Sequence, residues 1–122
     1  MHLAGLTKDP DAGKMEFLSG CATCHGTDGK GHGPLSAQLK TAPANLTTIA
    51  KRNNGVFPVS VVYETVDGRK EIKSHGTRDM PIWGYRYTLP PTPAATDYSI
   101  SEALIHARIL ALVDYLSRIQ EK

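Results

Sequence analysis

A short run, Cys21-Ala22-Thr23-Cys24-His25, constrains this chain of 122 residues more strongly than any other feature. Its two thiols are three positions apart, and a histidine directly follows the second one. Thiols with this spacing can each reach one vinyl group of a porphyrin and form a thioether, which places the next residue beneath the metal. The run is therefore the attachment motif of a c-type haem, and it predicts His25 as the proximal iron ligand.

The same run is compatible with other interpretations. A surface Cys-x-x-Cys can form a local disulfide, or it can contribute half of a zinc site. Zinc normally needs a second pair of ligands, and the chain has no cysteine besides Cys21 and Cys24. A thioredoxin-like motif would need a βαβ context, which the sequence pattern does not show. The pair therefore favours one covalently bound haem and its iron.

Length and composition favour a single domain covering residues 1–122. This length is ample for one hydrophobic core, and a haem would enlarge that core. The composition is 40% apolar and 21% charged, with no apolar run near the roughly 18 residues that a membrane span requires. Met1 to Lys8 lack the features of a secretory signal, so we expect residues 1–8 to be flexible or a remnant of the expression vector. We expect no transmembrane segment and no nucleic-acid partner.

Helices are predicted at both ends of the chain. Asp9 can cap a helix and Pro10 is tolerated at its first position, so the first helix should run from about Pro10 into the Cys21 region. Gly13, Phe17 and Cys21 recur at four-residue steps, which lines them up on one stripe. The last helix is predicted over residues 101–120. Its apolar face consists of Ile105, Ile109, Leu112, Val113, Leu116 and Ile119.

The middle of the chain gives weaker signals. Glycines at 26, 29, 31 and 33 predict a flexible loop after the histidine, and residues 35–39 fit one or two helical turns. Residues 56–66 fit either a strand or a helix; we favour a helix that Gly68 terminates. The prolines at 90, 91 and 93 predict a surface loop over residues 89–95.

The second iron ligand would decide the function, because a haem with one protein ligand has an open face for chemistry, whereas a haem with two is suited to moving electrons. The candidates are Met1, Met15, Met80, His2, His32, His75 and His106. Met1 and His2 lie on a terminus that is expected to fray. Met15 on an apolar helix face is more often a core residue. His32 would have to pass round the ring edge, and His106 lies beside the apolar stripe of its helix.

Met80 and His75 remain. Met80 stands in the run Gly-Thr-Arg-Asp-Met-Pro-Ile-Trp-Gly at residues 76–84, and with this run the chain resembles the class I cytochromes c. In that family a Gly-x-x-x-Phe-x-x-x-Cys-x-x-Cys-His helix is followed by a Met-Pro loop and then by a closing helix. The matching positions are Gly13, Phe17, Cys21, Cys24, His25, Met80 and Pro81, with residues 112–116 and Tyr115 similar to the closing helix.

This resemblance implies an all-α cytochrome c fold, in which the N- and C-terminal helices pack across each other and shorter helices and loops wrap one covalent haem. It favours His25 and Met80 as the iron ligands over a pair that contains His75. It also implies that the Pro34 carbonyl receives the proximal imidazole N–H, although a turn proline would look the same. Trp83 would give its indole N–H to a haem propionate, or serve packing alone. Other propionate candidates are Arg86, Lys51 and Arg52.

The resemblance implies a function as a periplasmic one-electron carrier that turns over no substrate of its own and is therefore not an enzyme. Its partners would be an electron-donating dehydrogenase and an electron-accepting oxidase or reductase. The segment from Lys30 to Pro90 carries nine basic and four acidic residues, a net charge of +5 that suits an acidic docking patch, although it can equally be a solvated face. The alternatives are a haem enzyme or gas sensor with an open or labile sixth position, and a permanent cytochrome subunit of a larger oxidoreductase.

Overall fold

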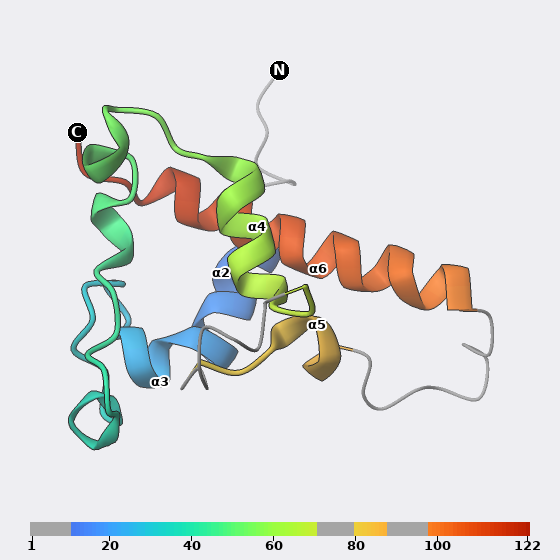
Figure 1. Cartoon of the computed structure of the whole chain (residues 1–122), viewed down its shortest axis with the longest axis horizontal. Coiled ribbons are helices and arrows are strands. Elements are labelled where there is room, and N and C mark those ends of the chain that lie inside the picture. Colours follow the sequence, from blue (N-terminus) through green and yellow to red (C-terminus); the bar gives the residue numbers. More distant parts are fainter. Residues whose placement is uncertain (1–10, 71–79, 88–97) are drawn as a thin grey trace.

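The computed structural model describes residues 11–70, 80–87 and 98–122, and within these ranges the chain is all-α, with no strand. Three consecutive helical segments at the start form one rod, and one long helix closes the chain (Figure 1). The elements are α2 (Ala12–Glu16), the π-helical turn η1 (Phe17–Cys21), α3 (Ala22–His25), the 3-10 turns η2 (Ser36–Gln38), η3 (Leu46–Thr48) and η4 (Lys51–Asn53), α4 (Val59–Asp67), α5 (Trp83–Arg86) and α6 (Tyr98–Arg118).

In the described part of the chain, the N-terminal rod begins at Ala12, two residues after the start that its sequence predicts. Asp11 is its cap, because the Asp11 carboxylate accepts the backbone N–H of Lys14 at 3.1 Å. Asp9 and Pro10, which were expected to cap and open this helix, lie outside the described residues. Both Asp9 and Asp11 are good capping residues, so the sequence alone could not decide between them.

The rod crosses α6 at Gly13, where the two helices come into close contact. A Cβ atom on Gly13 would lie 2.8 Å from the Tyr115 Cβ and would overlap the Ala111 carbonyl oxygen. One turn further along, the fully buried Phe17 ring packs against Tyr115 with 5.3 Å between ring centroids. The stripe that the spacing of Gly13 and Phe17 predicts is therefore the face that meets α6.

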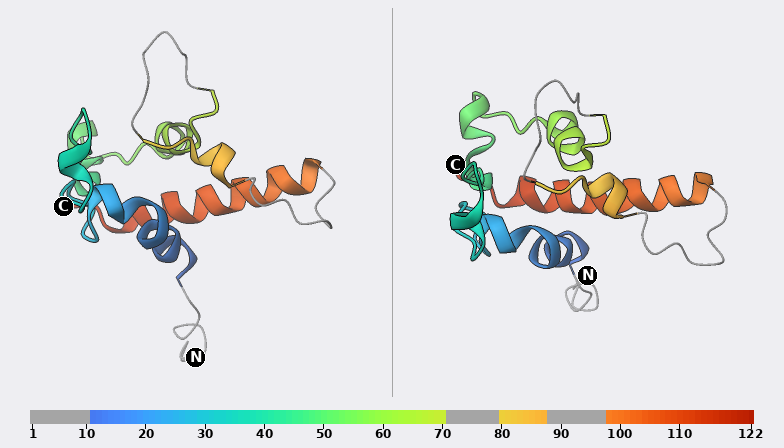
Figure 2. Two further views of the ribbon diagram at one scale, coloured as in Figure 1. Left: turned by 90° about the horizontal axis from the view of Figure 1, so that it is seen from below. Right: turned by 60° about the horizontal axis from the view of Figure 1, so that its bottom comes forward.

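The core follows the predicted apolar face of α6. Its members Ile105, Ile109, Leu112, Val113 and Leu116 are all buried, and Ile119 packs at their edge. Helix α4 contributes Val62 and Val66 to the same core. Figure 2 shows α4 and the N-terminal rod on opposite sides of α6, so that the long helix forms the centre of the molecule.

The middle segments largely follow their sequence-based prediction. Residues 36–38 form the expected helical turn, residues 59–67 are helical, and Gly68 ends that helix in a left-handed conformation with φ 73°. Gly26, Gly29 and Gly31 also have positive φ and turn the chain back along α3. The proline-rich segment predicted as a loop, residues 89–95, lies outside the described ranges. Among the helices that the structure describes, none has the length and apolar character needed to cross a membrane.

Candidate functional site

A cavity of about 620 Å³ lies between the N-terminal rod, residues 39–52, α4, residues 80–83 and α6. This volume falls within the range of about 300–1,000 Å³ that is usual for cofactor and ligand pockets. The wall of this cavity is mainly apolar, and it includes Cys21, Cys24, His25, Met80 and Trp83. The lining residues are Gly20, Cys21, Cys24, His25, Leu39, Lys40, Thr41, Ala42, Pro43, Ala44, Leu46, Ile49, Arg52, Pro58, Val61, Val62, Thr65, Val66, Met80, Pro81, Trp83, Leu112 and Leu116.

Both cysteines are free thiols on this wall. Cys21 ends the π-helical turn and Cys24 lies in α3, one residue before His25. Burial, together with the nearby charges of Glu16 and Cys24, raises the pKa of the Cys21 thiol to about 12. Because reactive dithiols and zinc ligands act as thiolates, which need a lowered pKa, this environment disfavours a redox-active dithiol. Among the described residues, no group of three or more His, Cys, Asp or Glu side chains could hold a metal ion, so the zinc alternative finds no further ligands there.

The imidazole of His25 is oriented by a backbone carbonyl. Its Nδ1 lies 2.9 Å from the Ala44 carbonyl oxygen. Since a carbonyl only accepts, the Nδ1 carries a proton, and in the neutral imidazole this leaves the Nε2 lone pair for a metal. A hydrogen bond of this kind fixes the ring and strengthens its donation to a bound metal.

Pro34 does not have the role that the resemblance implies, because Ala44 is the acceptor of the His25 N–H. The glycine loop folds back along α3, with Leu35 N–H donating to the Thr23 carbonyl and Gly33 N–H to the Cys24 carbonyl, both at 2.9 Å. Pro34 therefore lies exposed beside α3 and does not line the cavity. No side-chain pattern marks Ala44, because the group that acts is its backbone oxygen.

Met80 and Trp83 line the cavity from a different segment than His25. The Trp83 ring also packs against the N-terminal rod, since a Cβ atom on Gly20 would lie 3.0 Å from its Cη2. The guanidinium of Arg86 lies 5.7 Å from the Trp83 ring centroid. Trp83 therefore packs against its neighbours, as one of its two expected roles requires. Because it also lines the cavity, its indole N–H remains a candidate donor to a haem propionate.

Other candidate ligands lie elsewhere. His32 and His106 are exposed and do not line the cavity, and the ring of His106 is hydrogen-bonded to the Tyr63 hydroxyl at 2.7 Å. Met15 is 56% exposed, so the expectation of a core residue is wrong. It is two positions from both Gly13 and Phe17, which face α6, and about 100° of rotation per residue turns it to the opposite side. Met1, His2 and His75 lie outside the described residues.

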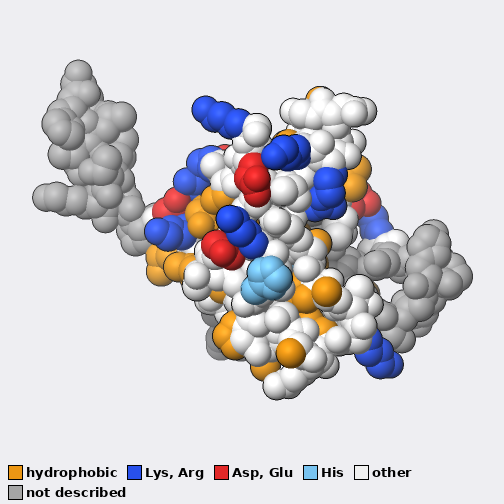
Figure 3. Space-filling model, turned by 90° about the vertical axis from the view of Figure 1, so that its left-hand side faces the viewer, with side chains coloured by type: hydrophobic (Ala, Val, Ile, Leu, Met, Phe, Trp, Pro, Cys, Tyr) orange, Lys and Arg blue, Asp and Glu red, His pale blue; other side chains and the backbone are white. Residues whose placement is uncertain are grey.

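One of the three further propionate candidates reaches the cavity. Arg52 lines it, and its guanidinium donates to the Asn45 carbonyl at 2.8 Å and to the Thr48 hydroxyl at 3.1 Å. Lys51 pairs instead with Glu121 at 3.8 Å. Figure 3 shows the face built by residues 26–55 and the C-terminus, where Lys and Arg side chains gather on the upper half and hydrophobic side chains lie below.

No family model, curated protein or solved structure matches this chain. The cavity has two thiols for covalent attachment, one imidazole with a free Nε2 and one thioether sulfur, all on a mainly apolar wall. Imidazole and thioether are common axial ligands of haem iron, and the residues present fit a covalently attached haem.

Proposed function

We propose that this protein is a one-electron carrier of the class I c-type cytochrome kind, with one haem attached through Cys21 and Cys24. His25 and Met80 would be the two axial iron ligands. The observation that supports this most directly is that all four side chains line one mainly apolar cavity, although Met80 is separated in the chain from the other three. The crossing of α2 and α6 at Gly13 and Phe17 agrees with the arrangement that this class would require.

Each part of the cavity has a role in this proposal. When bound, the haem supplies one-electron chemistry at its iron, and a methionine ligand raises the reduction potential. Ala44 holds the imidazole of His25 in one tautomer and one orientation. Leu112 and Leu116, which are buried, line the cavity from α6 and exclude water from it. The guanidinium of Arg52, at the exposed edge of the cavity, suits a propionate carboxylate.

A carrier of this kind would turn over no substrate, because two protein ligands close both faces of the iron. We further propose a periplasmic location and transient partners, namely an electron-donating dehydrogenase and an electron-accepting oxidase or reductase. Such encounters bury little area and are steered by charge. Lys30, Lys40, Lys51 and Arg52 are exposed, and the last three lie on the same stretch of chain that lines the cavity.

The absorption spectrum of the purified protein in both redox states, together with its alkaline pyridine adduct, tests this proposal. The adduct should be that of a haem with two thioether bonds, and the ferric protein should show the methionine-to-iron charge-transfer band. An adduct with unreacted vinyl groups would refute attachment through both cysteines. A five-coordinate ferrous spectrum would favour the haem enzyme or gas sensor, in which the sixth position is open.

A further inference from the structure

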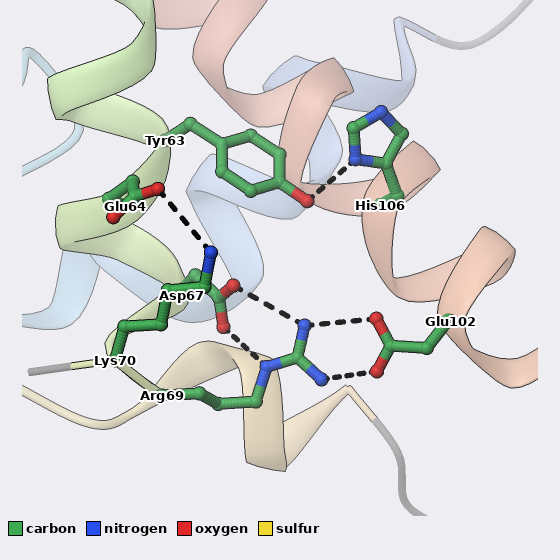
Figure 4. Close-up of polar contacts among 7 residues, drawn as sticks. All are labelled: Tyr63, Glu64, Asp67, Arg69, Lys70, Glu102 and His106. Carbon is green, nitrogen blue, oxygen red and sulfur yellow. Dashed lines mark hydrogen bonds and ion pairs between the residues drawn. The ribbon is translucent and has the colours of Figure 1, made fainter.

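A guanidinium held between two carboxylates joins the end of α4 to α6 (Figure 4). Arg69, two residues past the end of α4, donates to both carboxylate oxygens of Asp67 at 2.6 and 3.3 Å. The same guanidinium donates to both oxygens of Glu102 on α6. Asp67 is only 8% exposed, so this charge is largely removed from water. We call these three residues the Arg69 bridge.

The end of α4 makes this bridge possible. Gly68 takes the left-handed conformation, and its N–H donates to the Glu64 carbonyl at 2.9 Å. The chain reverses there, so that Arg69 folds back over Asp67. One turn earlier on α4, Tyr63 is hydrogen-bonded to His106 at 2.7 Å, one turn later on α6 (Figure 4). The two helices are therefore joined at two successive turns.

Helix α5 rests directly on the Arg69 bridge. Gly84 is buried, and a Cβ atom at this position would overlap both the Asp67 carboxylate and the Arg69 guanidinium. Gly84 directly follows Trp83 and is four residues past Met80. The side chains of Met80 and Trp83 line the cavity. Arg69 and Gly84 thus meet at the bridge, and Met80 lies four residues before Gly84.

We infer that the Arg69 bridge is a positioning element for Met80, which fixes both ends of the chain that presents this side chain to the cavity. This inference rests on the proposed function, in which Met80 is an iron ligand. A side chain whose flanking backbone is already held loses less conformational freedom when it binds a metal. Its binding is therefore more favourable. Removing the guanidinium would leave the Asp67 and Glu102 carboxylates close together without the cation that they share. It would also remove atoms against which Gly84 of α5 packs.

Arg69→Gln in the haem-containing protein tests this inference, with Arg118→Gln as a matched control. Arg118 also bridges two carboxylates from α6, donating to Asp11 at 2.7 and 2.9 Å and to Asp114 at 3.0 Å, but it does not line the cavity. Both variants lose an arginine bridge of similar geometry, and only one of them lies under α5.

Two readouts report the methionine ligand directly: the methionine-to-iron band of the ferric protein and the rate at which the ferrous protein binds carbon monoxide. Arg69→Gln should weaken the band and raise the rate about tenfold or more, because the methionine leaves the iron more often. Arg118→Gln should keep both at wild-type values while it lowers the midpoint of thermal unfolding. Gly84→Ala, which keeps all three charges but displaces α5, should resemble Arg69→Gln.

Three outcomes would overturn the inference or its basis, and they differ from one another. Wild-type band and rate in Arg69→Gln, or equal changes in Arg118→Gln, would show that the bridge does not position Met80. A wild-type protein without the methionine band would refute the proposed function itself, and the inference with it. Should Arg69→Gln fail to fold, Glu102→Gln removes only the more exposed half of the bridge, and an unchanged band there would count against the inference.

Discussion

The imidazole of His25 depends on a chain segment that the C-terminus holds in place. The Ala44 carbonyl accepts its N–H, and the next turn of chain is clamped by Gln120. The Gln120 amide donates to the Leu46 carbonyl at 2.6 Å and accepts from the Ala50 N–H at 2.9 Å. Ala44 and Gln120, far apart in sequence, thus fix the orientation of the His25 ring. The Ala44 acceptor is a backbone carbonyl, so changing a side chain cannot remove it.

Asp11 combines a helix cap with an ion pair, and the two roles can be separated by pH. The Arg118 guanidinium, helped by the Lys14 N–H, holds the pKa of Asp11 at about 2, below its ordinary value of 3.8. The stabilisation from this charge is complete above about pH 4 and is lost as pH falls through about 2, because the unfolded chain takes up the proton first. Asp11→Asn keeps the cap acceptor and removes the charge. It should unfold at a lower urea concentration than the wild type at pH 7, with a gap that narrows towards pH 2.

Asp11→Ala is the control, because it removes the cap as well as the charge. It should be less stable than Asp11→Asn by an amount that does not depend on pH. Measurements at low ionic strength give the largest effect, since salt screens an exposed pair. A gap between wild type and Asp11→Asn that stays constant from pH 7 to pH 2 would contradict the assigned ion pair.

Individual site residues were predictable from sequence where a side chain itself carries the chemistry. Residue type and spacing identify Cys21, Cys24 and His25, and the resemblance adds Met80; the structure brings these four side chains to one cavity. Ala44 was missed because a backbone oxygen leaves no mark on the sequence. Pro34 was assigned its role by resemblance, but it lies exposed beside α3 and does not line the cavity.

At the scale of whole elements, the crossing of α2 and α6 rests on the missing side chain of Gly13. An exposed Gly→Ala change in a helix would stabilise the protein by about 1 kcal/mol through helix propensity. Here the added methyl group would meet the Ala111 carbonyl and the Tyr115 Cβ, so overpacking outweighs that gain. Gly13→Ala should therefore lower the free energy of unfolding by about 1–3 kcal/mol in urea titrations.

Lys14→Ala is the comparison for this change, because Lys14 is exposed on the next position of the same helix. It should stay within about 0.5 kcal/mol of the wild type. If Gly13→Ala were as stable as Lys14→Ala, the two helices would not be in contact at this position.

The type of an element was predictable where nearby residues determine it. The apolar residues of α6 recur with the helical period, and Gly68 readily takes the left-handed conformation that ends α4. The start of α2 was not predictable, since Asp9 and Asp11 are both good caps and the ion pair of Asp11 with Arg118 of α6 is a tertiary contact. The π-helical turn before Cys24 was also missed: it widens the backbone step so that Ala22 N–H donates to the Phe17 carbonyl, and no residue pattern specifies it.

Across the whole molecule, the basic segment from Lys30 to Pro90 is weakly opposed by the rest of the chain, which leaves a net charge of only +2. In the proposed function this asymmetry steers an acidic partner towards the edge of the cavity. Electron transfer to a small anionic oxidant should then be faster than to a cationic oxidant of similar potential, and the difference should shrink as salt rises from 10 mM to about 1 M, where the screening length falls to about 3 Å. Equal electron-transfer rates with the two oxidants, unchanged by salt, would show that charge does not steer the partner.

The central claim is that Met80 closes the sixth position of a haem iron, and the ferric absorption spectrum of Met80→Ala beside the wild type tests it most directly. We predict that the wild type shows the methionine-to-iron band, that Met80→Ala lacks it, and that only the variant binds carbon monoxide rapidly when reduced. The same spectrum in both proteins, or rapid carbon monoxide binding by the wild type, would contradict the claim.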